Sequence, residues 1–149
     1  GQGVGMDQHF RNIPLGQSEL LREGKDLLIL AVGPLVYQAL QAAQNLSRNN
    51  GIEATVVDVR FIKPLDRDSI LDHLKRIKHV ITLEDGVRKG GFSTLIRELI
   101  LEGNVQDCRL LCLGVPEEIV ITASRSELLA QYQLDAAGVE RSAREFLNS

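Results

Sequence analysis

The amino-acid sequence predicts a three-layer α/β domain, in which helices cover both faces of a mainly parallel sheet. Five short apolar segments are bounded by Gly, Pro, Asn or Asp, as strands of such sheets are. The segments between them carry apolar residues at intervals of three and four, which is the period of a helix that buries one face. Strands and helices therefore alternate along the chain, as in β-α-β units.

Composition and charge exclude several classes of protein. The chain has 149 residues, 44% of them hydrophobic, and a formal net charge of −3, which suits one globular domain with a core. Acidic and basic residues are mixed, so no basic stripe indicates binding to nucleic acid. No apolar run approaches the roughly 20 residues that span a bilayer, and the N-terminal residues lack the charged-then-apolar layout of a signal peptide. We expect a cytoplasmic protein that does not enter a membrane.

The two cysteines, Cys108 and Cys112, lie four residues apart in a predicted strand. At roughly 3.3 Å per residue their α-carbons would be about 13 Å apart, which is too far for a disulfide. We expect two unpaired thiols.

The first elements follow from turn and capping signals. Residues 1–13 begin with a glycine-rich stretch, which indicates a linker from an upstream domain, so we place the folded domain at 14–149. A strand at 18–22 turns into an antiparallel apolar strand at 27–32. Pro34 suits the first position of a helix that ends at Gly51.

The remaining elements are predicted in the same way. A strand at 54–62 is followed by a helix for which Asp66 is the expected N-cap. A strand at 78–84, a turn at 85–91 and a helix at 92–101 come next, and then a strand at 109–115. Ser124 and Asp135 are the expected caps of the last two helices.

The junction between the strand at 78–84 and the helix at 92–101 is the first place to look for a site. In open parallel sheets, ligands and partners meet such strand–turn–helix junctions. The cations Arg88 and Lys89, with Gly90 and Gly91 at a helix start, form a candidate anion site. The alternative is that the glycines only let the helix approach a neighbouring backbone. No Walker or dinucleotide-binding motif is present.

Two pairs of charged residues end predicted strands. Asp58 and Arg60 would lie on one face of the strand at 54–62, either as a local ion pair or as a contact to another domain. Glu84 and Asp85 are adjacent, so they would make a poor acid–base pair for one substrate. The histidines and serines form no catalytic arrangement. We therefore expect no catalytic, cofactor-binding or metal-ligating residue in this chain.

Several motifs together resemble the C-terminal domain of the 1-deoxy-D-xylulose-5-phosphate synthases, a transketolase-like family. The segment DVRFIKPLD at 58–66 alone is similar to the wider transketolase-like group, including the β subunits of 2-oxoacid dehydrogenases. The further segments that narrow the resemblance to the synthases are 14–17, 82–85, 90–93, 113–117 and 134–139. One departure is Thr122-Ala123, where many members have His-Gly, so a role for that histidine is not carried over.

The resemblance implies a five-stranded mixed sheet of order 1-3-2-4-5 with the first strand antiparallel. It also implies a parent enzyme that uses thiamine diphosphate and Mg²⁺ to join pyruvate, with loss of CO₂, to D-glyceraldehyde 3-phosphate for isoprenoid and thiamine biosynthesis. The cofactor motifs of the family belong to upstream catalytic domains and are absent from this chain. A bacterial member would be cytoplasmic, whereas a plant or algal member would lie in the plastid stroma.

On this resemblance, the chain is expected to be a non-catalytic domain that packs against upstream catalytic domains of the same chain and supports a homodimer. The expected interface residues are Asp58, Arg60, Glu84, Asp85 and Phe92. One alternative is the matching domain of a 2-oxoacid dehydrogenase β subunit, which would dock a carrier protein. Another is a free-standing anion-binding module.

Overall fold

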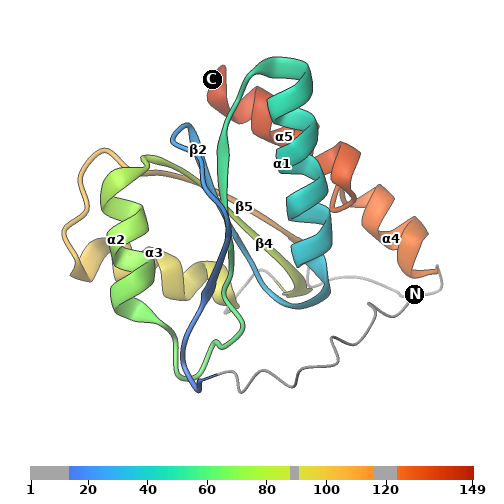
Figure 1. Cartoon of the computed structure of the whole chain (residues 1–149). Coiled ribbons are helices and arrows are strands. Elements are labelled where there is room, and N and C mark those ends of the chain that lie inside the picture. The colour runs from blue at the N-terminus through green and yellow to red at the C-terminus, as the bar shows by residue number, and fades with distance from the viewer. Residues whose placement is uncertain (1–13, 88–90, 116–123) are drawn as a thin grey trace.

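A single five-stranded sheet separates two layers of helices (Figure 1). The computed structural model describes residues 14–87, 91–115 and 124–149. The helices α1 (Val36–Asn50), α4 (Arg125–Gln131) and α5 (Ala136–Leu147) lie on one side of the sheet, and α2 (Arg67–Arg76) and α3 (Phe92–Glu102) lie on the other (Figure 1). The predicted three-layer α/β architecture is confirmed.

The strand order is β1-β3-β2-β4-β5, with β1 antiparallel to β3 and the other pairs parallel. This is the order and direction that the resemblance implied. Because β1 pairs with β3, the turn that follows β1 does not form a hairpin with β2. The five strands are β1 (Glu19–Arg22), β2 (Leu27–Ala31), β3 (Ala54–Asp58), β4 (His79–Val87) and β5 (Arg109–Val115).

The first three α-helices connect successive parallel strands as crossovers, and the last two follow β5. A 3₁₀ turn, η1 (Gly33–Leu35), contains Pro34 near its start and leads into α1. The α-helix therefore begins at Val36, two residues after the expected start. The five α-helices are α1 (Val36–Asn50), α2 (Arg67–Arg76), α3 (Phe92–Glu102), α4 (Arg125–Gln131) and α5 (Ala136–Leu147).

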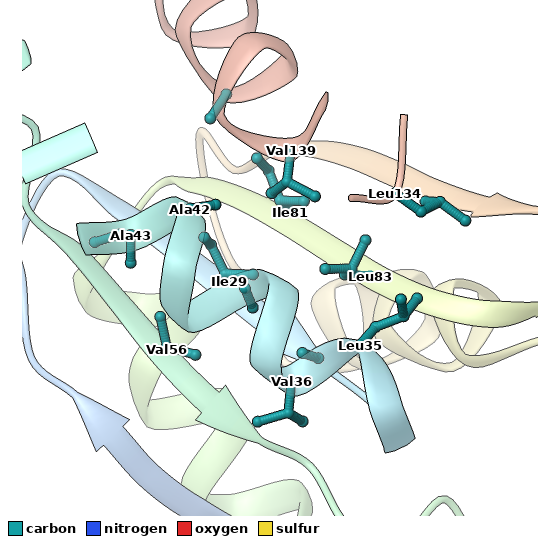
Figure 2. Close-up of a cluster of buried hydrophobic side chains, with 14 of the residues drawn as sticks. Ile29, Leu35, Val36, Ala42, Ala43, Val56, Ile81, Leu83, Leu134 and Val139 are labelled. Carbon is teal, nitrogen blue, oxygen red and sulfur yellow. The ribbon is translucent and has the colours of Figure 1, made fainter. Parts of the chain in front are cut away.

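The central strand β2 divides its side chains between two cores. All five of its residues are fully buried. Leu27, Ile29 and Ala31 join the cluster beneath α1 and α5, where Ile29 lies among side chains of α1 (Figure 2). Leu28 and Leu30 join the cluster beneath α2 and α3. The alternation follows from the two-residue period of a strand, and it explains why a continuous apolar run is needed here.

Most of the predicted helix ends are confirmed. Gly51 ends α1 in the left-handed region, with φ +65°. Ser124 and Asp135 accept hydrogen bonds from the backbone N–H groups of Glu127 and Gly138. Asp66 occupies the N-cap position of α2, but its carboxylate does not cap the helix. It accepts instead from the backbone N–H and the hydroxyl of Ser18, at 2.8 and 2.9 Å.

No helix within the described ranges is both long and apolar enough to cross a membrane.

Candidate functional site

The carboxyl ends of β3, β2 and β4 lie side by side, as the parallel register requires. Ala31 at the end of β2 pairs with Asp58 on one side and with Leu83 on the other. The connection between β2 and β3 runs to one side of the sheet and that between β4 and β5 to the other, so the crevice between β2 and β4 is the topological switch point. Four of the five expected interface residues lie within β3 and β4 or within two residues of the end of β3.

Glu84 is the central carboxylate of this edge. Its side chain is buried in the domain, with a residue exposure of 6%. One carboxylate oxygen accepts from the backbone N–H of Phe92 at 3.0 Å, and the other from that of Ser93 at 3.4 Å. These N–H groups open α3 and would otherwise have no partner within the helix. Glu84 therefore joins the end of β4 to the start of α3.

Phe92 is fully buried and belongs to the core beneath α2 and α3. The structure thus places both Glu84 and Phe92 inside the domain, where each contacts its own chain. Direct contact of these two side chains with another domain would first require their exposure. The interface expected at this edge consequently depends on the other three residues, Asp58, Arg60 and Asp85, which are half-buried.

The expected arrangement of Asp58 and Arg60 is wrong. The strand β3 ends at Asp58, and Arg60 has a left-handed backbone with φ +62°, so the two side chains are not neighbours on a strand face. The Asp58 carboxylate accepts from the backbone N–H of Arg60 at 3.1 Å. The Arg60 guanidinium instead forms an ion pair with Glu19 of β1. Burial raises the pKa of Asp58 above its ordinary value, against the opposing effect of that hydrogen bond.

The strand β4 is longer than predicted. It continues through Asp85 and Gly86 to Val87, where it pairs again with Val115 after a shift in register. Arg88, Lys89 and Gly90 of the candidate anion site lie outside the described residues, as do Thr122 and Ala123. Gly91 is the N-cap residue of α3. The anion-site prediction therefore stays a prediction.

The described residues do not offer a ligand set for a divalent metal ion such as Mg²⁺. Within the described ranges, no group of three or more His, Cys, Asp or Glu side chains is arranged to hold a metal ion. Glu84 and Asp85 are adjacent carboxylates, and both oxygens of the Glu84 carboxylate already accept hydrogen bonds from the start of α3. No chemical step is assigned to these residues.

The cysteines are unpaired, as predicted, and both are half-buried. Burial raises the pKa of the Cys108 thiol, which keeps it protonated and poorly nucleophilic. Cys112 lies 3.4 Å from the guanidinium of Arg97.

Two of the three histidines have contacts that the sequence did not indicate. His73 in α2 is buried beside Arg76, and the ring of His79 packs edge-on against Phe146 with ring centroids 5.5 Å apart. His9 lies outside the described residues. No motif surrounds His73, so only the assembled fold reveals its surroundings.

A five-stranded mixed sheet of this order, with only the edge strand β1 antiparallel and helices on both faces, defines a class of three-layer α/β domain. The sequence profile described as "Transketolase, C-terminal domain" matches residues 16–139. The chain belongs to the transketolase C-terminal domain family.

The curated relatives are synthases of 1-deoxy-D-xylulose 5-phosphate. The chain is 42% identical over 147 residues to 1-deoxy-D-xylulose-5-phosphate synthase 1 of Geobacter metallireducens, covering 99% of this chain and 23% of the relative. It is 40% identical over 145 residues to the synthase of Pelotomaculum thermopropionicum, covering 97% of this chain and 23% of the relative. The chain thus spans about a quarter of the length of these relatives.

Solved structures agree with the fold. One described as a split gene transketolase in an inactive β4 tetramer superposes with a TM-score of 0.82 at 30% identity, covering 93% of this chain and 44% of that one. A transketolase of Campylobacter jejuni superposes with a TM-score of 0.64 at 16% identity, covering 87% of this chain and 18% of that one. At that identity the second likeness concerns the fold alone.

Proposed function

We propose that this chain is the C-terminal domain of a thiamine-diphosphate-dependent 1-deoxy-D-xylulose-5-phosphate synthase. The whole enzyme would condense pyruvate with D-glyceraldehyde 3-phosphate and release CO₂. The observation that carries the proposal is the 42% identity over 99% of this chain to a synthase of which it spans 23%. The rest of such a synthase would supply the cofactor and the catalytic residues.

Within that enzyme the domain would act as a scaffold. Its role would be to pack against the catalytic domains and to support the homodimer. The main support is that polar side chains at the carboxyl edge bind other parts of the domain. The Glu84 carboxylate accepts from the backbone of α3, and the Arg60 guanidinium forms an ion pair with Glu19. Groups satisfied inside the domain stabilise it, but they offer no poised acid or base for a substrate.

The division of roles is tested by calorimetry. Thiamine diphosphate, with Mg²⁺ present, is titrated into the 149-residue chain, and we expect no heat beyond dilution. The positive control is the full-length synthase under the same conditions. Binding of the cofactor to the 149-residue chain with a micromolar Kd would refute the division.

The scaffold role is tested in the full-length synthase by reversing charges at the carboxyl edge. Asp58→Lys and Asp85→Lys are each compared with Glu98→Lys, which changes an exposed carboxylate on α3. We expect the first two to lower the dimer fraction in analytical ultracentrifugation, while Glu98→Lys leaves it unchanged. An unchanged dimer in all three variants, with normal activity, would remove this edge from the assembly.

A further inference from the structure

A cavity of about 450 Å³ lies at the opposite edge of the sheet from Glu84, where the parallel strands begin. It is bounded by β1, the turn before β2, the start of β3 and the last turn of α2. This volume is within the range of small-molecule sites in proteins. The side chains that line it include Leu20, Glu23, Lys25, Thr55, His73 and Arg76.

One wall of the cavity is held rigidly. The Thr55 hydroxyl donates to the carbonyl of Gly24 at 2.5 Å and accepts from the Gly24 N–H at 2.9 Å. A Cβ atom on Gly24 would lie 2.4 Å from the backbone carbonyl of Glu53, so the turn can approach β3 this closely only with glycine. The wall is therefore formed before any ligand arrives, which lowers the cost of binding.

The contact with Arg76 determines which ring nitrogen of neutral His73 carries the proton. Its Nδ1 atom lies 2.9 Å from the Arg76 guanidinium, which has only donors, so Nδ1 accepts and the neutral ring carries its proton on Nε2. Nε2 makes no hydrogen bond to another described residue, although His73 is only 7% exposed. Thr82 Oγ1 is the one side-chain polar atom in the described part that is buried without a partner. Nε2 must therefore reach solvent, and the cavity is the solvent space that His73 lines.

Four charged side chains line the cavity, and they are Glu23, Lys25, Glu53 and Arg76. The Glu53 carboxylate is engaged by Arg22 at 2.8 Å and by the Ser47 hydroxyl at 2.6 Å. Lys25 and Glu23 form no ion pair or hydrogen bond with a described side chain. With Glu53 balanced by Arg22, the lining keeps two cations, Lys25 and Arg76, and one carboxylate, that of Glu23. The carboxylates of Asp72 and Asp66 also act on His73, but they do not line the cavity.

We propose that this cavity is a binding site for a small anion bearing a carboxylate or phosphate group. One oxygen of the anion would accept from Nε2–H of His73, and its charge would face Lys25 and Arg76. A donor from a buried neutral ring and a cation on a flexible stem are a suitable pair for such a group. A metal cation is not the ligand we propose, because the lining offers His73 and carboxylates in no arrangement that could hold one.

The proposal is tested by NMR on the 149-residue chain at constant ionic strength. Inorganic phosphate and acetate are titrated separately, which distinguishes the two sources of negative charge. We expect saturable shifts of the Gly24 and Thr55 amides and of the His73 ring for at least one of them. The ¹⁵N shifts of the ring should also show the Nε2–H tautomer before any anion is added.

Two pairs of variants decide the outcome. His73→Phe removes the donor and should raise the Kd at least tenfold, whereas His73→Gln, whose amide can both accept from Arg76 and donate, should raise it less. Lys25→Ala should also weaken binding, whereas Lys75→Ala, an exposed lysine on the same helix as His73, should not. The lysine pair keeps the test decisive if His73→Phe fails to fold.

Three results would overturn the proposal. Shifts confined to residues 88–91 would assign anion binding to the turn before α3. Linear, scattered shifts would indicate an adventitious ion only. Equal effects of Lys25→Ala and Lys75→Ala would show that the cavity lining does not recognise the charge.

Discussion

The bond between Glu84 and the start of α3 gives the most direct prediction about stability. Glu84→Ala removes the acceptor of two backbone N–H groups, of which the one on Phe92 is the better placed at 3.0 Å against 3.4 Å for Ser93. A buried donor left without a partner costs about 1–3 kcal/mol, and a lost carboxylate at a helix N-terminus costs about 0.3–1 kcal/mol more. We expect Glu84→Ala to lower the free energy of unfolding by about 1–4 kcal/mol.

Glu84→Gln separates the acceptor from the charge. Its amide oxygen can still accept one N–H, but its amide nitrogen faces the second donor, so we expect an intermediate loss of about 1–2 kcal/mol. Glu98→Ala is the matched control, because Glu98 is an exposed carboxylate in the same helix and its removal should cost no more than about 0.5 kcal/mol.

The assay is urea unfolding of the three variants and the parent, with unchanged m-values required for the comparison. Hydrogen exchange supplies a second readout, since the Phe92 amide should exchange faster in Glu84→Ala while the Ile96 amide, deeper in the helix, changes less. The reasoning is refuted if Glu84→Ala and Glu98→Ala unfold within about 0.5 kcal/mol of each other.

Three further changes test other parts of the structure. Gly24→Ala places a Cβ atom 2.4 Å from the backbone of Glu53, so thermal unfolding should show a loss of about 2 kcal/mol or more. Burial raises the pKa of Asp58, so the folded state favours the protonated carboxyl group. The contribution of Asp58 to stability is therefore present in acid and is lost as the pH rises through that raised pKa. Asp58→Asn keeps the acceptor for Arg60, so at pH 7 it should be at least as stable as the parent, and a less stable variant there would contradict this. Burial lowers the pKa of His73, so the chain should lose stability as the pH falls below 6.5 toward the lowered pKa, and the loss should be smaller in His73→Gln.

Local signals in the sequence predicted the elements and most of their ends. A cap such as Asp135 acts on an N–H three residues away, and the apolar stripe of a helix repeats within the helix itself, so both are visible in a short window. The order of the strands is different, because it depends on pairs that are distant in sequence. That order came from the resemblance to a family, and the residues alone indicated a hairpin between β1 and β2 that does not form.

The errors at the carboxyl edge have the same origin. Arg60 leaves the strand conformation, and its guanidinium pairs with Glu19, which is 41 residues away. Asp66 has the sequence position of a helix cap, but its carboxylate accepts hydrogen bonds from Ser18, which is 48 residues away. The cavity beside His73 is assembled from four elements, so no single stretch of sequence contains it. Local rules predict what a residue does for its own element, whereas long-range partners decide where polar side chains are finally used.

The pairing of β1 with β3 has a consequence for the order of events in folding. Glu19 of the first strand is opposite Asp58 of the third, so β1 has no partner until β3 has been synthesised and has joined β2. The earliest strand in the chain should therefore be among the last to dock, because closing that loop gains contacts only after the β2–β3 pair exists. Pulse-labelling during refolding should find the Leu20 amide protected later than those of Ile29 and Val56, and simultaneous protection would contradict this order.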